Sequence, residues 1–367
     1  MGLSLGWYMD CIFFAVPFGA AGTGAVSKKQ KESFVIMANR VSPEVAVISN
    51  PHSWRNRSSN HLAELCHILR FYPGVTHYIP PHLRELKDII NQIIQDKPDL
   101  IILNGGDGTI HHILSLLYQK TGFSKLPLLA LMTGGTTNLI AGELGLKISV
   151  TQLLEKIYQQ GLTKLNVLAK PAMVLTHAAI AVPKIGFFFG TATFTSATIS
   201  SRQHMRTKTI KSTLSVLLPL VRSVWQAVKM TIGWGSTIDQ EQPLYQGYPA
   251  KITLEDQLPI LSNQTLFLAT TLSRMSFGLK VFWGKGEGAI RYLSVPFPAF
   301  RWLFAIGPIL CGRPTKWMIK HGYQSGRTSK IVLGIDCPSF FDGEEIPVSD
   351  VHPIELLISP IIPFVIS

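Results

Sequence analysis

The chain has 367 residues, of which 46% are hydrophobic and only 15% are charged, and its formal net charge is +12. This length exceeds a typical single domain, so we expect two domains that each bury a core. The four cysteines are widely scattered and form no C-x-x-C pair. This spacing indicates neither a zinc site nor a disulfide framework, and it favours reduced, cytosolic thiols.

The N-terminal segment, residues 1–35, opens with an apolar run. A basic region in front of that run is missing and Asp10 interrupts it, so we predict a docked or interfacial segment rather than a cleaved signal peptide. The longest candidate membrane span, residues 212–234, contains Pro219, Arg222 and Lys229. Because a span needs about 20 largely uncharged apolar residues, we predict no transmembrane helix.

Strands and helices are expected to alternate over residues 36–146, as in an α/β domain with a doubly wound parallel sheet. Four short apolar runs read as strands, at 45–49, 75–79, 99–103 and 126–132. Between the second and third, residues 83–94 space their apolar side chains for one buried helical face. The third and fourth strands both run into polar, glycine-bearing turns, where open parallel sheets bind ligands. We predict a nucleotide-binding domain.

Beyond residue 146 the expected strands follow one another without regular helices, so residues 147–347 predict a mainly antiparallel β domain that holds the substrate. One long amphipathic helix, 204–232, interrupts them, and its stripe favours core or interdomain packing over a membrane-binding face. The last segment, 348–367, is expected to form a strand that returns to the first domain.

The positive charge lies in this second part of the chain. Between residues 200 and 330 there are 17 Lys/Arg and 5 Asp/Glu, a difference of +12, so the rest of the chain is neutral. Such a field attracts phosphate-bearing partners. Interspersed tryptophans favour an anionic membrane surface over nucleic acid, and we expect no nucleic-acid partner.

The segment Asn104-Gly105-Gly106-Asp107-Gly108-Thr109 carries the most chemical information. Its three glycines expose backbone N–H groups and permit positive φ, so the loop can wrap anionic oxygens. A helix beginning near Ile110 adds its positive N-terminal end. Asp107 cannot bind phosphate directly, so it should act through Mg²⁺ or through a hydroxyl or amide partner. The alternative is a tight strand-to-helix turn with Asp107 as the cap.

Gly-Gly-Asp-Gly-Thr after a buried strand resembles the hallmark of the diacylglycerol kinase catalytic family, which includes sphingosine kinases and bacterial lipid kinases and has NAD kinases as distant relatives. Three further segments resemble family motifs in the family's order. They are Asn50-Pro51-His52-Ser53, Gly135-Thr136-Thr137-Asn138 with Ala141, Leu144 and Gly145, and Asp342-Gly343-Glu344. The resemblance spans nearly the whole chain and implies the NAD-kinase/diacylglycerol-kinase-like fold.

By this resemblance the chain is an ATP- and Mg²⁺-dependent lipid kinase at the cytoplasmic face of a membrane. Glu344 or Asp342 would be the general base, with a slight preference for Glu344, and Asp107 would join them at the catalytic centre. The residues implied to bind ATP are Asn50, Ser53, Gly105, Gly106, Asp107, Gly108, Thr109, Gly135, Thr136 and Asn138.

Several positions depart from the family pattern: Trp54 replaces a glycine, His111-His112 replace Asn-Glu, Leu139 replaces an aspartate and Gly142 replaces an arginine. Adjacent histidines on a helix point apart, so we interpret them as capping or packing residues rather than a metal pair. The segment 284–288 replaces an Asp-rich metal segment with one Glu beside a Lys, so we predict no structural Mg²⁺ site. Two other functions stay open, a non-catalytic nucleotide or lipid binder and a kinase of a soluble nucleotide such as NAD.

Overall fold

The computed structural model describes residues 42–57, 61–133, 139–191, 247–255, 257–273, 280–297, 302–346 and 351–366. Three sequence-based expectations fall outside these ranges: the N-terminal segment 1–35, the helix 204–232, and the contacts of Gly135, Thr136 and Asn138. Among the described residues, no helix combines the length and the apolar composition needed to cross a bilayer.

The first part of the chain forms a parallel sheet in the order β2-β1-β3-β4, with the short β5 beside β4. These strands are β1 (Val45–Ser49), β2 (Val75–Tyr78), β3 (Leu100–Gly105), β4 (Leu128–Thr133) and β5 (Gly145–Leu146). The predicted α/β architecture is confirmed. β3 runs two residues beyond its predicted end because Asn104 and Gly105 continue the pairing with β4.

Helices cover both faces of this sheet, as the doubly wound fold requires. One face packs against α4 (Leu86–Asp96) and α5 (Asp107–Thr121), and the other against α3 (His61–Leu69) and α7 (Val150–Gln160). α7 begins beyond residue 146, where the sequence suggested a domain boundary. Its apolar stripe, which includes Leu154, is buried against the first sheet. The residues that pack around this sheet therefore extend past residue 146.

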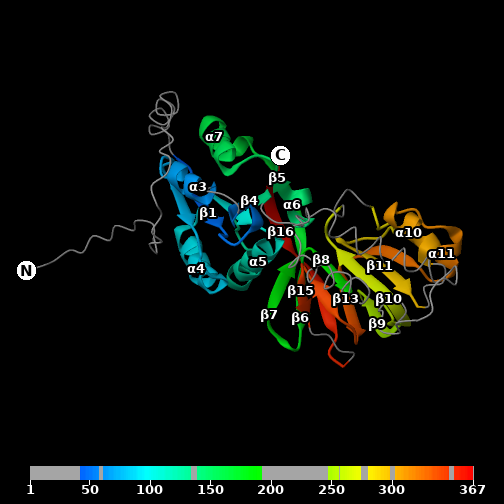
Figure 1. Cartoon of the computed structure of the whole chain (residues 1–367). Coiled ribbons are helices and arrows are strands. Elements are labelled where there is room, and N and C mark those ends of the chain that lie inside the picture. Colours follow the sequence, from blue (N-terminus) through cyan, green and yellow to red (C-terminus); the bar gives the residue numbers. More distant parts are fainter. Residues whose placement is uncertain are drawn as a thin grey trace, which may run out of the picture.

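The remaining sheet is almost entirely antiparallel and carries the rest of the chain (Figure 1). Its strands are β6 (Asn166–His177), β7 (Ile180–Gly186), β8 (Phe188–Thr191), β9 (Tyr248–Leu254), β10 (Ile260–Thr270), β11 (Ile290–Pro296), β12 (Gln324–Thr328), β13 (Lys330–Ile335), β14 (Ser339–Phe341) and β15 (Glu344–Ile346). Two helices, α10 (Trp302–Leu310) and α11 (Lys316–Lys320), cover one face of it. The predicted antiparallel β-rich part is confirmed.

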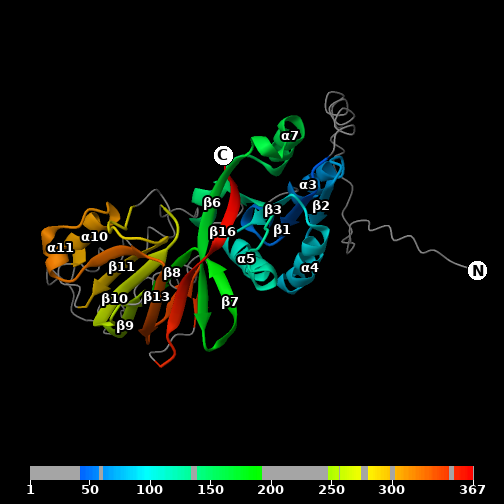
Figure 2. The same ribbon diagram turned by 180° about the vertical axis from the view of Figure 1, so that it is seen from behind.

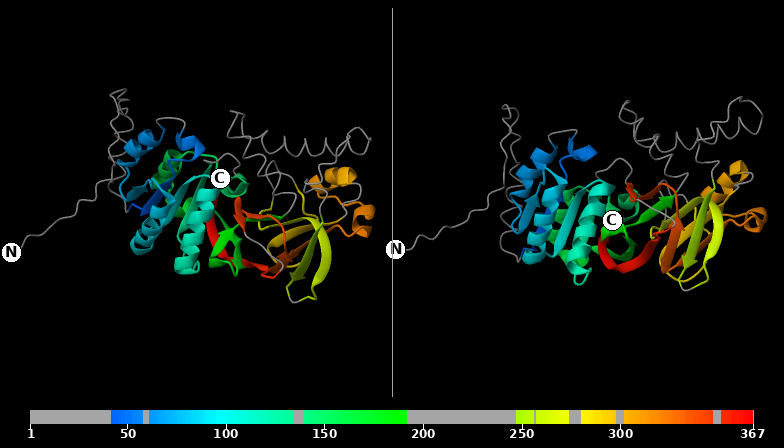
Figure 3. Two further views of the ribbon diagram at one scale, coloured as in Figure 1. Left: turned by 60° about the horizontal axis from the view of Figure 1, so that its bottom comes forward. Right: turned by 90° about the horizontal axis from the view of Figure 1, so that it is seen from below.

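The last strand, β16 (Ile354–Ile366), joins the two parts into one continuous sheet. It pairs in parallel with β4, with Phe364 opposite Leu129, and antiparallel with β6 and β13. Figures 2 and 3 show β16 running between the two parts of the molecule. Ile354, Leu356, Ile362 and Phe364 are fully buried, so the connection is part of the core rather than a linker.

Shorter helices complete the edge of the first sheet near the expected ligand site. They are α2 (Trp54–Arg57), α6 (Leu139–Leu144), and the 3₁₀ turns η1 (Leu83–Glu85) and η2 (Leu162–Lys164). α2 follows β1 directly, and α6 follows the undescribed residues 134–138 after β4. The carboxyl ends of β1, β3 and β4 thus each lead toward a helix at the same sheet edge.

Candidate active site

The carboxyl ends of β1 and β3 form the topological switch point of the first sheet, because β2 lies on one side of β1 and β3 on the other. Asn50 occupies this point and bridges the two strand ends. Its backbone N–H donates to the carbonyl of Asn104 at 3.0 Å, and its side-chain amide donates to Thr109 Oγ1 at 2.7 Å. Asn50 Oδ1 also accepts from the backbone N–H of His52 at 2.8 Å. The first predicted motif is therefore tied directly to the glycine-rich segment.

A network of hydrogen bonds among buried polar residues stabilises this junction. Asn104 Nδ2 donates to Ser49 Oγ at 3.1 Å, and Asn56 Nδ2 donates to the Asn50 carbonyl at 2.7 Å. Ser49 Oγ also lies 2.9 Å from His77 Nε2. Burial lowers the pKa of His77 to about 4, so the ring is neutral at physiological pH. Sequence reasoning missed Asn56 and His77, since neither belongs to a motif.

The glycine-rich segment turns from β3 into α5 at Gly106, and α5 begins at Asp107. Its glycines serve different purposes. A Cβ on Gly105 would lie 2.9 Å from Thr109 Cβ, so this glycine allows the close packing of strand and helix. A Cβ on Gly108 would meet no described atom within 4 Å, so this residue borders open space at the helix N-terminus. Anionic oxygens are favoured there by the exposed N–H groups and the helix dipole.

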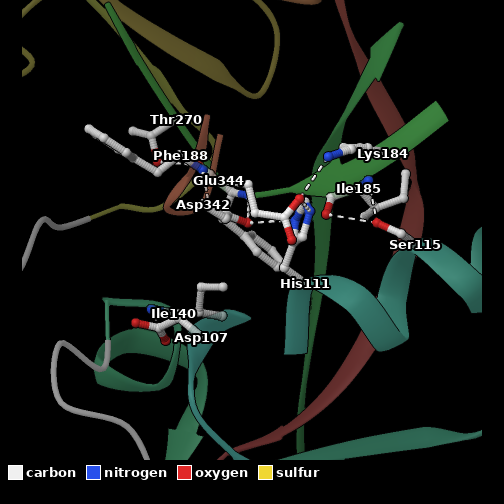
Figure 4. Close-up of polar contacts among 11 residues, drawn as sticks. Asp107, His111, Ser115, Ile140, Lys184, Ile185, Phe188, Thr270, Asp342 and Glu344 are labelled. Carbon is white, nitrogen blue, oxygen red and sulfur yellow. Dashed lines mark hydrogen bonds and ion pairs between the residues drawn. The ribbon is translucent and has the colours of Figure 1, made fainter. Parts of the chain in front are cut away.

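Asp107 holds the start of α5 against α6. Its Oδ1 accepts the backbone N–H of Ile140 at 3.2 Å, which links the glycine-rich turn to the helix that follows β4 (Figure 4). This amide partner agrees with one of the two roles expected for Asp107. The intervening residues Gly135, Thr136 and Asn138 lie outside the described part of the chain.

Ser53 carries an unusual buried hydroxyl beside this junction. The residue is only 7% exposed, and its Oγ has no hydrogen-bond partner among the described residues. A buried hydroxyl without a partner is costly, of the order of 1–3 kcal/mol, so such groups call for an explanation such as a bound ligand. Ser53 is one of the residues implied to seat the nucleotide.

The second group of predicted residues lies on the β14–β15 hairpin. Asp342 and Gly343 form its two-residue turn, with φ of 46° and 89°, the left-handed conformations that an Asp-Gly hairpin turn adopts. The two carboxylate oxygens of Asp342 accept the backbone N–H groups of Phe187 and Phe188, both at 2.8 Å. The Asp342 side chain is 1% exposed. Asp342 therefore fixes the hairpin to the turn between β7 and β8.

Glu344, two residues further on, has a more open carboxylate, with the side chain 41% exposed. Lys184 Nζ donates to its Oε2 at 2.7 Å, and His111 Nε2 lies 3.6 Å from the same oxygen. Contact with His111, together with Lys184, lowers the pKa of Glu344 to about 2 against the opposing effect of burial. Glu344 is thus ionised at neutral pH and half open to a cavity.

His111 is the residue that joins the two groups, and sequence reasoning interpreted it as a cap or packing residue. The structure agrees with a packing role and adds two carboxylate neighbours to it. The ring is 2% exposed, packs edge-on against Phe341, and lies between Glu344 and Asp342, with Nδ1 3.6 Å from Asp342 Oδ2. Burial alone would lower its pKa, but the two carboxylates outweigh burial and raise the pKa to about 9. His111 is therefore a buried cation (Figure 4).

α5 connects the two groups of site residues. Asp107 opens the helix at the glycine-rich turn, and His111 lies one turn later, roughly 6 Å along the axis. Ser115, one turn further, accepts the backbone N–H of Ile185 on β7 at 2.9 Å. The helix that begins at the expected phosphate site is thus fastened to the strands that carry Lys184 and Glu344.

A cavity of about 290 Å³ opens beside these residues, between α5 and β7. Its polar lining includes His112, Lys184 and Glu344, and its apolar lining includes Leu116 and Val182. A second cavity of about 160 Å³ lies at the carboxyl ends of β3 and β4, where Asn104 and Met132 line it together with residues of α3 and α7. Among the described residues, no group of three or more His, Cys, Asp or Glu could hold a metal ion.

Comparison with known proteins shows a resemblance between the first part of the chain and one family. Residues 44–169 match the model of the diacylglycerol kinase catalytic domain, so the predicted resemblance is confirmed. None of the curated proteins matches the sequence of the chain.

Solved structures share the fold over nearly the whole chain. A diacylglycerol kinase from Bacillus anthracis str. Sterne has a TM-score of 0.54 at 14% identity, covering 88% of this chain and 96% of that one. A second protein of the same organism, provisionally assigned as a diacylglycerol kinase, has a TM-score of 0.55 at 16% identity. That match covers 87% of this chain and 95% of the other. The likeness in fold therefore extends beyond residue 169.

Proposed function

Because residues 44–169 match the model of the diacylglycerol kinase catalytic domain, we propose that the chain is an ATP-dependent kinase that transfers the γ-phosphoryl group to a lipid hydroxyl. One observation carries the proposal: α5 begins at the glycine-rich turn and, one turn later, contacts both Asp342 and Glu344 through His111. A phosphate site at the start of α5 and a half-open carboxylate held beside the same helix by His111 meet the main requirement of phosphoryl transfer, which is positioning.

ATP would bind at the carboxyl edge of the first sheet. Gly105 to Thr109 and the N-terminus of α5 would hold its phosphates, helped by the undescribed Gly135, Thr136 and Asn138. Open space at Gly108 supports this, since oxygens can approach the backbone there. Asn50 would position the turn through Thr109, and the buried Ser53 hydroxyl would find its partner in the nucleotide. The cavity beside Asn104 is the space available for the nucleoside.

Mg²⁺ bound with ATP would neutralise the charge that develops on the transferred group. Asp107 is the residue that would hold it, because a carboxylate at the helix N-terminus repels phosphate unless a cation lies between them. Asp342 fits a metal poorly, since both of its oxygens already accept backbone N–H groups.

Glu344 is our choice as general base. Its carboxylate would accept the proton of the lipid hydroxyl as that oxygen attacks the γ-phosphorus and the bond to ADP breaks. A pKa of about 2 makes Glu344 a weak base. Phosphoryl transfer passes through a loose transition state with little covalent chemistry for the protein to perform, so a well-placed weak base suffices. Lys184 and His111 would keep the carboxylate in place.

The acceptor would be reached at the anionic cytoplasmic face of a membrane, to which the protein would bind peripherally. The basic excess between residues 200 and 330 supports this location. The substitutions Leu139 and Gly142 favour one second candidate, a nucleotide- or lipid-binding protein without turnover, since both follow the Gly-Thr-x-Asn segment beside the phosphate site.

Labelled ATP, a panel of lipids in vesicles, and NAD as a soluble acceptor test the proposal together. Label transferred to a lipid only when vesicles are present supports the lipid kinase. Label transferred to NAD without vesicles supports a soluble-nucleotide kinase instead. ATP binding by calorimetry without transfer to any acceptor supports the binding protein and overturns the kinase.

A further inference from the structure

The outer surface of α10 is unusual for a helix that faces water. No side chain in the helix, Trp302–Leu310, is charged or carries a hydroxyl or amide. Its inner face is buried, with Ala305 0% and Ile309 6% exposed against β10 and β11. Its outer face presents Phe304, which is 71% exposed, followed by the exposed Gly307. A helix that is apolar all round is expected inside a protein or against lipid.

α11 continues this surface with a mixture of apolar and basic side chains. Met318 points inward and is fully buried, while Ile319 is 60% exposed. Lys316 and Lys320 flank Ile319 and are both exposed. Arg313, also exposed, lies in the turn that leads from α10 to α11. Three exposed cations therefore lie close in sequence to the exposed Ile319, on and before the helix that lies next to α10 (Figure 1).

No acidic residue offsets these cations within the local sequence, because residues 288–335 contain neither aspartate nor glutamate. Water-exposed surfaces of soluble proteins normally intersperse both signs of charge and keep large apolar side chains few. An apolar centre with a one-signed basic border matches an anionic lipid surface instead. Apolar side chains enter the headgroup region, and each nearby Lys or Arg adds about 1 kcal/mol of attraction.

We propose that the outer surface of α10 and α11, formed by Phe304, Arg313, Lys316, Ile319 and Lys320, is the face on which the protein docks to an anionic bilayer. We call it the docking face. It gives the membrane association proposed above a specific location. Figure 1 shows α10 and α11 at the end of the β-rich part farthest from α3 and α4.

The docking face is linked to the carboxylate hairpin through one strand. α10 packs in the same apolar cluster as Phe188 of β8, and the backbone N–H of Phe188 donates to Asp342 Oδ1 at 2.8 Å. The docking face and the strand that fixes the hairpin therefore share one apolar cluster. This arrangement suits an enzyme whose acceptor is a lipid in the bilayer.

Sedimentation with vesicles, without ATP, tests the docking face. Equimolar phosphatidylglycerol and phosphatidylcholine vesicles are compared with phosphatidylcholine alone. We expect the double variant Lys316→Gln/Lys320→Gln to lose about 25-fold in partitioning to the anionic vesicles, at about fivefold for each charge. The matched control is Lys87→Gln/Lys120→Gln, which removes two exposed cations from α4 and α5 and should change partitioning less than twofold.

Phe304→Ser supplies a second, uncharged test, since its side chain is exposed and its loss should leave the melting temperature unchanged. It should weaken binding to anionic vesicles without changing the salt dependence. An equal loss of vesicle partitioning in both lysine double variants would overturn the docking face. Wild-type partitioning that does not depend on phosphatidylglycerol would also overturn it. Vesicle binding that depends on the docking face while no lipid is phosphorylated would leave this inference standing and reject the kinase.

Discussion

His111 lies between the two late carboxylates, with Nε2 3.6 Å from Glu344 Oε2 and Nδ1 3.6 Å from Asp342 Oδ2. The ring belongs to the same helix as the glycine-rich turn, while the carboxylates lie more than 200 residues later in the sequence. One buried side chain thereby fastens the expected phosphate site to the hairpin that carries the proposed base. The first prediction follows from its charge.

His111→Gln should destabilise the protein in a pH-dependent way. The pKa of His111 is raised from 6.5 to about 9, so its stabilisation is complete below about pH 6.5 and disappears as the pH rises through about 9. The pKa of Glu344 is lowered to about 2, so its contribution is complete above about pH 4.5 and is lost as the pH falls toward 2. Urea unfolding should show a loss of about 1–3 kcal/mol at pH 6, shrinking above pH 9.

The control for this variant is His67→Gln on the exposed side of α3, which should show little loss at either pH. A difference between wild type and His111→Gln that stays constant from pH 6 to pH 9.5 would contradict a charged His111.

Asp342→Asn should damage stability more than chemistry. Asparagine keeps the positive φ of the turn but offers one acceptor oxygen where Asp342 uses two, so one backbone N–H, of Phe187 or Phe188, is left unpaired. We expect a loss of about 1–3 kcal/mol in the free energy of unfolding. The exposed Asp336→Asn is the matched control and should lose less than about 0.5 kcal/mol. Equal stabilities of the two variants would argue against the structural role.

Alanine at Gly105 and at Gly108 should have opposite effects. At Gly105 the new Cβ would lie 2.9 Å from Thr109 Cβ, so we expect a destabilisation of about 1–3 kcal/mol. At Gly108 the Cβ would meet no described atom, so stability should be kept or slightly raised while ATP affinity falls. Thermal melts and ATP titration calorimetry separate the two. Unchanged ATP affinity in Gly108→Ala would remove this residue from the phosphate site.

Ser53→Ala and Ser115→Ala form a second contrasting pair, since both hydroxyls are buried. Ser53 Oγ has no described partner, so its removal should keep or raise the stability of the free protein and weaken ATP binding about two- to tenfold. Ser115 Oγ accepts the N–H of Ile185, so its removal should cost about 1–3 kcal/mol of stability and leave ATP binding unchanged. A clear fall in the melting temperature of nucleotide-free Ser53→Ala would contradict the ligand role.

Much of the fold could be predicted because it rests on local patterns. The strand before Asn104 is a continuous apolar run that is buried between two helical layers, and the Asp-Gly turn at Asp342 has the conformation that its sequence favours. The sheet that α7 covers could not be predicted, because nothing in an amphipathic stripe says which sheet it packs against. Its contacts with Val45 and Leu65 are set by tertiary packing.

Only those site residues that belong to a sequence motif could be predicted. His111 was interpreted as a capping or packing residue without its carboxylate partners, because these come from the β14–β15 hairpin and no periodicity near α5 encodes contacts so distant in sequence. The sequence favoured Glu344 over Asp342 as the base only slightly. Their burial separates them, with the Asp342 side chain 1% and the Glu344 side chain 41% exposed, and burial depends on how β7 and β8 pass beneath the hairpin.

Transfer of the γ-phosphoryl group by Glu344→Gln tests the central claim most directly. The glutamine keeps the size of the side chain and an oxygen for Lys184 but cannot accept the proton. With lipid vesicles and labelled ATP, we predict a fall in kcat of about 10²- to 10⁴-fold with ATP affinity unchanged. Wild-type transfer that is equalled by Glu344→Gln would contradict the assignment of Glu344 as the base in this phosphoryl-transfer site.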